Sequence, residues 1–214
     1  MTEASDFLTA TRTFYDAVAE DYYDQFRDLY TKLPWDRAVL AVYAELVGAG
    51  AKVADLGCGP GRVTGQLAAL GLSVSGLDLS ESMLRVARRE NPGIRFEQGS
   101  MLELDHDDAS LDGVVSWYSS IHTPAEQLPR LLAEFRRVLK PGGHALLAFQ
   151  VGDEPKHHDR PWGHPVSLDF HRRRPEAMAE LLAEAGFSVR SRTVREPEPD
   201  LGEKVPQAYV VARA

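Results

Sequence analysis

The sequence predicts an α/β protein with a doubly wound, seven-stranded sheet that is mostly parallel and has an antiparallel edge. From about residue 51 onward, short strand-like runs alternate with segments of helical periodicity. This alternation is typical of a parallel sheet covered by helices on both faces. The last two strand-like runs, 187–194 and 205–211, have no helix between them. We therefore expect them to form an antiparallel pair at one edge of the sheet.

The first fifty residues are predicted to be helical. Apolar residues recur at helical spacing from Phe14 to Phe26, and a second amphipathic segment follows Pro34. The length of 214 residues fits one α/β domain with a small addition. We therefore divide the chain into an N-terminal helical lid, residues 1–50, and a doubly wound domain, residues 51–214, within one globular unit.

Four further helices are predicted from their start signals. One begins near Arg62 and another after Ser80, which has the character of an N-cap. Thr123-Pro124-Ala125-Glu126 has the form of a capping box, and Pro175 opens the last helix. The strands before the antiparallel pair are predicted at 52–56, 73–78, 94–97, 111–117 and 144–151.

Composition and charge exclude several classes of partner. The formal net charge is −8, which argues against capture of nucleic acid or of an anionic membrane surface. The run Arg172-Arg173-Arg174 is too short to change that conclusion. The single cysteine, Cys58, rules out an intrachain disulfide. The acidic N-terminus lacks the features of a signal peptide, and no apolar run is long enough to span a bilayer, so we expect a cytoplasmic protein.

The run Asp55-Leu56-Gly57-Cys58-Gly59-Pro60-Gly61 lies where the first strand of the sheet meets the following helix. In open parallel sheets ligands bind at the carboxyl ends of the strands, and glycines let the backbone approach a ligand closely. Asp78 ends the second strand, where a carboxylate can accept both hydroxyls of a ribose. The third glycine of a dinucleotide fingerprint is replaced by Arg62. Asp55 would repel a pyrophosphate but suits a ligand that carries an ammonium group.

These motifs resemble those of the class I S-adenosylmethionine-dependent methyltransferases. The run 53–61 resembles the family's first motif, Leu77-Asp78-Leu79-Ser80-Glu81-Ser82-Met83-Leu84 its second, and Leu139-Lys140-Pro141-Gly142-Gly143 the turn before its fifth strand. The tyrosine-rich segment from Phe14 to Tyr23 is similar to the N-terminal lid of many small-molecule members. The resemblance implies a Rossmann-like fold and S-adenosylmethionine as cofactor, with S-adenosylhomocysteine as product.

The resemblance also implies roles for individual residues. Asp55 and Gly57 would hold the methionine amino group, and Asp78 the ribose. Ser100 stands where many relatives have an aspartate that accepts from the adenine amino group; a serine hydroxyl can also accept. Cys58 is interpreted as a small loop residue, not a nucleophile. The full set of predicted cofactor-binding residues is Tyr15, Tyr22, Asp55, Gly57, Cys58, Gly59, Asp78, Leu79, Met83, Ser100, Met101 and Trp117.

The catalytic and substrate residues are harder to predict, because the cofactor supplies most of the reactivity. His122 is the candidate general base, since it follows the fourth strand and precedes a predicted helix N-terminus that would lower its pKa. The alternative is a local hydrogen bond at the turn. The histidine-rich connection after the fifth strand is expected to cover the substrate, and no spacing in it matches a metal signature. The predicted substrate-binding residues are Tyr118, His157, His158 and His164.

The sequence thus predicts transfer of a methyl group from S-adenosylmethionine to an O, N or S atom of a small molecule, by a monomer or homodimer. A cofactor-binding protein of the same fold that serves as a cyclase or regulator remains possible. An NAD-dependent oxidoreductase is disfavoured by the absence of a third glycine. A macromolecular methyltransferase is disfavoured by the acidic charge when the macromolecule is RNA or DNA. The identity of the acceptor does not follow from the sequence.

Overall fold

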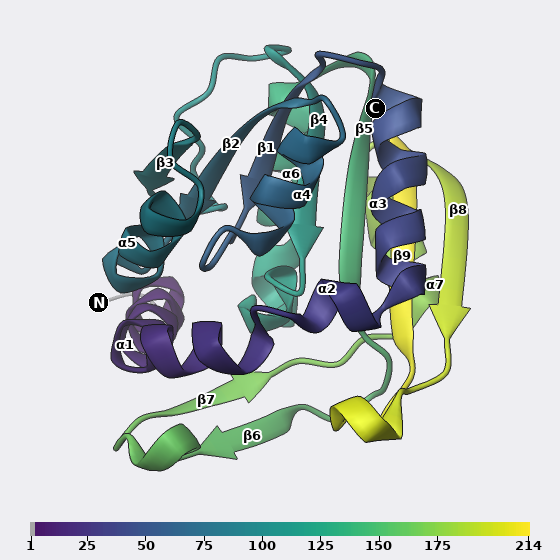
Figure 1. The fold of residues 1–214 in the computed structure, drawn as a ribbon. Helices are drawn as coiled ribbons and strands as arrows, with labels where there is room; N and C mark the ends of the chain where they lie inside the picture. Colours follow the sequence, from purple (N-terminus) through teal and green to yellow (C-terminus); the bar gives the residue numbers. More distant parts are fainter. Residues whose placement is uncertain (1–2) are drawn as a thin grey trace.

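The computed structural model describes residues 3–214, and the sheet within them has seven strands in the order β3-β2-β1-β4-β5-β9-β8 (Figure 1). The pairs among the first five are parallel, whereas β9 is antiparallel to both β5 and β8. The predicted antiparallel edge is therefore confirmed. The strands are β1 Lys52–Leu56, β2 Ser73–Asp78, β3 Arg95–Gln98, β4 Leu111–Trp117, β5 Leu139–Gln150, β8 Ser188–Arg195 and β9 Gln207–Arg213.

Helices cover both faces of this sheet, as the alternation of strands and helices predicts. Neighbouring residues of a strand point to opposite faces. Val115 and Leu146 pack in the core with α3 and α4, whereas Val114 and Leu147 pack in the core with α6 and α7. The helices of the domain are α3 Pro34–Val47, α4 Arg62–Ala69, α5 Glu81–Glu90, α6 Leu128–Val138 and α7 Pro175–Glu184.

The start of α6 differs from the prediction. A helix opening at the Thr123 capping box would place Pro129 in its interior, where proline removes a hydrogen bond and clashes with the preceding turn. The helix instead begins at Leu128, so that Pro129 lies in its first turn. The preceding residues form two short 3₁₀ turns, Ser120–His122 and Ala125–Gln127.

The connection after β5 contains a two-stranded antiparallel ribbon that the sequence did not predict. It is formed by β6 Lys156–Asp159 and β7 Ser167–Phe170. Figure 1 shows this ribbon beneath helix α1 Glu3–Phe26, which crosses the carboxyl ends of the parallel strands. The short helix α2 Leu29–Lys32 then leads into α3. In the part of the chain described by the structure, no helix has the length and apolarity needed to cross a membrane.

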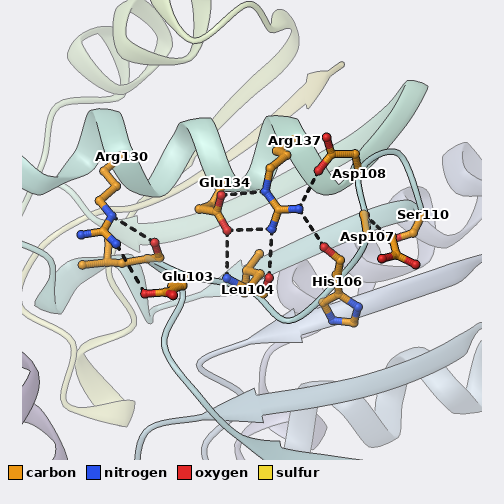
Figure 2. Close-up of polar contacts among 10 residues, drawn as sticks. Glu103, Leu104, His106, Asp107, Asp108, Ser110, Arg130, Glu134 and Arg137 are labelled. Atoms are coloured by element: carbon orange, nitrogen blue, oxygen red, sulfur yellow. Dashed lines mark hydrogen bonds and ion pairs between the residues drawn. The ribbon is translucent and has the colours of Figure 1, made fainter.

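One arginine of α6 holds the long loop between β3 and β4 against the helix (Figure 2). The Arg137 guanidinium donates to the carbonyl oxygens of Leu104 and His106, at 2.9 and 2.7 Å. It also pairs with the carboxylates of Glu134 and Asp108, each at 2.8 Å. Glu134 in turn accepts from the Leu104 amide at 2.8 Å. These contacts fix residues 104–108, just after the segment that reaches the carboxyl edge of the sheet.

We expect Arg137→Met to reduce the free energy of unfolding by about 1.5–3 kcal/mol, because two partly buried carbonyls and Glu134 lose a charged donor. Arg130→Met on the same helix is the matched control. Arg130 donates to one carbonyl, that of Leu102 at 3.1 Å, and its ion pair with Glu103 is long, at 3.7 Å, and exposed. Its removal should therefore cost less, about 1 kcal/mol. Urea unfolding of both variants measures the difference. Equal losses would show that Arg137 contributes no more than a surface charge.

Candidate active site

A cavity lies at the carboxyl ends of the parallel strands, between the glycine-rich turn and α1. It encloses about 890 Å³ of space free of protein atoms, its open mouth included, a size suited to a small ligand. Its walls come from the glycine loop (residues 57–61), the end of β2, residues 99–102, the end of β4 and the inner face of α1. All twelve residues predicted for the cofactor line this first cavity.

Gly57, Gly59 and Gly61 of the loop all have left-handed backbone, and the first two serve different purposes. Gly57 has a φ of +73°, and a Cβ there would lie 2.3 Å from the Ser119 Cβ. Its lack of a side chain lets the loop pack directly against the end of β4. Gly59 has a φ of +54°, and a Cβ there would meet nothing within 4 Å. Gly59 therefore leaves open space beside the cavity, where a ligand can approach the backbone.

Asp78 is held in place by backbone amides. Its Oδ2 accepts from the Gly59 amide at 2.8 Å, and its Oδ1 accepts from the Ser80 amide at 2.9 Å. Ser80 caps α5 by accepting from the Met83 amide at 3.1 Å, and its hydroxyl donates to Asp16 of α1 at 2.6 Å. The pKa of Asp78 is raised to about 6, mainly by burial and to a smaller extent by the charge of Asp16. One carboxylate thus joins β2, the glycine loop and α5.

Asp55 carries an acceptor without a partner. Its Oδ2 accepts from the Thr64 hydroxyl at 2.6 Å, whereas its Oδ1 is buried and has no hydrogen-bond partner among the described residues. Burial raises the pKa of Asp55 to about 7, and the charge of Asp78 adds to the shift. Such a group is stabilised by a cation or by a donor from a ligand. The first cavity is therefore suited to a ligand that carries positive charge.

Three cavity residues of α1, Phe7, Leu8 and Thr11, were not predicted. The signal for them is present in the sequence. Phe7 and Thr11 continue the helical spacing of Phe14 and Val18 toward the N-terminus. Helix α1 begins at Glu3, so this stripe of residues reaches the wall near Ser100 and Met101.

His122 lies in the first cavity beside Tyr15 of α1. Its Nε2 is 2.8 Å from the Tyr15 hydroxyl, and its Nδ1 is buried without a well-formed hydrogen bond among the described groups. The pKa of His122 is lowered to about 3, as the sequence suggested, but the main cause is burial. The proposed helix-terminus effect is wrong, because α6 begins only at Leu128 and His122 ends a 3₁₀ turn. The ring is neutral at physiological pH.

A second cavity adjoins the first and encloses about 1410 Å³ of space free of protein atoms. Tyr22, Arg62, Trp117 and Tyr118 line both cavities. Tyr118 has a φ of +53°, a backbone strain of about 1–2 kcal/mol for a residue with a Cβ. Strain of this kind clusters at functional sites, and here it places Tyr118 directly between the two cavities.

The three histidines predicted to bind substrate are not brought together. His158 lines the second cavity, with its ring 4.2 Å from that of Phe170. His157 and His164 line neither cavity. His157 pairs with Asp169 across the ribbon at 2.7 Å, and His164 pairs with Asp21 of α1 at 2.8 Å. Over residues 3–214, no cluster of three or more His, Cys, Asp or Glu side chains could hold a metal ion.

Comparison with known proteins gives relatives of one kind. The family model "Methyltransferase domain" matches residues 53–143. A probable S-adenosylmethionine-dependent methyltransferase of Mycolicibacterium smegmatis is 31% identical over 186 residues, which cover 85% of this chain and 65% of that protein. A trans-aconitate 2-methyltransferase of Deinococcus radiodurans is 38% identical over 142 residues, which cover 65% of this chain and 50% of that protein.

The fold is shared with solved methyltransferases. One of them is the 1,6-didemethyltoxoflavin-N1-methyltransferase of Burkholderia thailandensis, solved with 1,6-didemethyltoxoflavin and S-adenosylhomocysteine. The two structures superpose with a TM-score of 0.76 at 22% sequence identity, and the match covers 100% of this chain and 91% of that protein. The chain spans about half the length of several curated relatives. The matched region runs from β1 through the glycine loop and Asp78 to the turn within β5. The chain therefore contains a methyltransferase domain, and its relatives are S-adenosylmethionine-dependent methyltransferases.

Proposed function

We propose that this protein transfers a methyl group from S-adenosylmethionine to an O, N or S atom of a small molecule. The observation that carries the proposal is the unpartnered, buried Oδ1 of Asp55 in the same cavity as Asp78. A ligand with both an ammonium group and a ribose satisfies this pair. S-adenosylmethionine has both groups and supplies a methyl group on a positively charged sulfur.

The residues of the first cavity fit that cofactor. Asp55 and Gly57 would hold its amino group. Asp78 would accept from its ribose hydroxyls, because each carboxylate oxygen already bound by a backbone amide can accept a second hydrogen bond. Leu79 and Met101 supply apolar surface for the adenine. We further propose that residues 1–50 act as a lid, since α1 closes the first cavity with Tyr15 and Tyr22.

The second cavity is the proposed site of the acceptor. It shares a wall with the first cavity, so the two ligands can lie side by side. Relatives with the names trans-aconitate 2-methyltransferase and 1,6-didemethyltoxoflavin-N1-methyltransferase act on small molecules, which supports a small acceptor here. The chain then contributes orientation and exclusion of water. A screen of small acceptors with isotopically labelled cofactor tests the proposal, and cofactor binding without any labelled product would contradict it.

Ligand affinity should depend on pH through Asp55. Its pKa of about 7 in the free protein falls when an ammonium group binds beside it, so binding releases a proton below pH 7. The association constant of S-adenosylhomocysteine should therefore fall as pH drops from 7.5 to 5.5, by up to about ten-fold per unit below the free pKa. Calorimetry in two buffers of different ionisation enthalpy measures the released proton. Asp55→Asn should bind more weakly and lose most of this dependence; a flat wild-type profile would refute the cation-binding role.

Substitutions of Gly57 and Gly59 should have different effects, the first mainly on stability and the second mainly on ligand affinity. Gly57→Ala forces a clash with Ser119 as well as backbone strain, so its loss of stability should exceed the roughly 1–2 kcal/mol of a left-handed alanine. Gly59→Ala has only the strain but fills the space beside the cavity. We expect its affinity for S-adenosylhomocysteine to fall about ten-fold or more. Gly71→Ala is the matched control, with a φ of +87° and open space outside both cavities.

The role of His122 can be separated from that of its hydrogen bond to Tyr15. If the ring takes the acceptor's proton, His122→Ala should lower kcat by roughly 10²-fold, the low end for general bases, because a pKa near 3 makes it a weak one. His122→Gln can still hydrogen bond to Tyr15 but cannot take the proton. If both variants lose the same amount of kcat while their affinity for S-adenosylhomocysteine stays within about two-fold of the wild type, His122 acts as a general base. Near-normal turnover in the glutamine variant assigns His122 to the orientation of Tyr15 instead.

A further inference from the structure

The acidic groups of the second cavity already have partners. Asp36 accepts from the Tyr209 hydroxyl at 2.6 Å and lies 3.6 Å from the Arg195 guanidinium. Glu203 pairs with both terminal nitrogens of Arg195 and accepts from the Glu198 amide. Arg195 therefore contacts both carboxylates that line this cavity and offsets part of their charge.

Three basic groups of the cavity have no such partners. Lys156 opens the ribbon, Arg172 follows its second strand, and Lys204 lies between β8 and β9. Figure 1 shows the start of β6 beside the yellow connection that leads into β9. Within residues 3–214, no ion pair joins Lys156, Arg172 or Lys204 to a carboxylate, and the Arg172 Nε is buried without a hydrogen-bond partner. Three separate segments thus bring unpaired cations to one place.

These cations also repel one another. Burial lowers the pKa of Lys156, and Lys204 and Arg172 lower it further. Burial likewise lowers the pKa of His158, with Lys156 among the charges that add to the shift. The chain has 32 acidic residues against 24 basic ones, so carboxylates are plentiful, yet among the described residues none forms an ion pair with this cluster. Lys156 and Arg172 are partly buried, whereas Lys204 is exposed. Unpaired, partly buried charges are costly, and an anionic ligand would remove the cost at Lys156 and Arg172.

The remaining walls of the cavity are largely apolar and aromatic. Planar ligands bind well to such surfaces. Phe14 and Phe26 come from α1, Trp162 and Phe170 from the ribbon, and Trp117 from the end of β4.

We propose that the second cavity binds a small carboxylic acid with a planar apolar body, its carboxylate placed on Lys156, Arg172 and Lys204. None of these three residues lines the first cavity, whereas Trp117 and Tyr118 line both. The carboxylate is therefore an anchor at the end remote from the cofactor cavity, and the methylated atom lies at the opposite end of the molecule. That this acid is the methyl acceptor rests on the proposed function; the anion site itself does not.

The test uses a panel of planar carboxylic acids, each with its matched neutral amide, for example 4-hydroxycinnamic acid and 4-hydroxycinnamamide. Binding to the full chain is measured by thermal shift and calorimetry, without cofactor and with saturating S-adenosylhomocysteine. The variants are Lys156→Met, Arg172→Met and the charge-conserving Arg172→Lys. Arg192→Met, on the exposed face of β8 and outside both cavities, is the matched control.

We expect acids to bind and their amides to bind at least about ten-fold more weakly, since a lost charged contact is worth that much or more. Arg172→Met and Lys156→Met should remove most of this difference, Arg172→Lys should keep part of it, and Arg192→Met should keep all of it. The proposal is overturned if no acid binds, if amides bind equally well, or if the variants bind acids as the wild type does. Failure to bind S-adenosylhomocysteine with acid binding intact would instead reject the proposed function alone.

Discussion

The candidate site depends on two buried carboxylates, Asp55 and Asp78, that face one cavity. Asp78 is fixed by the amides of Gly59 and Ser80, so it sets the shape of the glycine loop and the start of α5. Asp55 keeps one oxygen unpartnered among the described residues. Burial raises the pKa of both groups, which means that the fold bears an electrostatic cost at this point. A positively charged ligand would remove that cost.

The parts of this site that the sequence predicted are those whose geometry is local. Asp55 lies near the end of β1, Gly57 and Gly59 directly follow that strand, and Ser80 caps the helix that begins beside it. Their positions are set by a single strand-turn-helix unit, and parallel pairing then brings Asp78 next to the loop. The antiparallel edge follows from the absence of an α-helix between the last two strands, whereas the strand order is seen only in the structure.

The parts that the sequence did not predict depend on contacts between distant segments. His157 and Asp169 pair only because the ribbon forms, and its four-residue strands are too short and polar to stand out. The pKa of His122 was predicted in the right direction for the wrong reason, since its burial comes from Tyr15 and Phe170, which are remote in the sequence. The start of α6 was a different kind of error, because Pro129 was visible and outweighed the capping box.

Helix α1 is a wall of both cavities. Tyr15 lines the first, Phe14 the second, and Tyr22 lines both. The helix is held to the ribbon by a small apolar cluster of Phe14, Val18 and Leu168 and by the pair of Asp21 with His164. A ligand in either cavity packs on this wall and adds to the contacts that keep it in place. We therefore expect the residence time of a ligand in one cavity to depend on the occupancy of the other, although different residues would bind the two ligands.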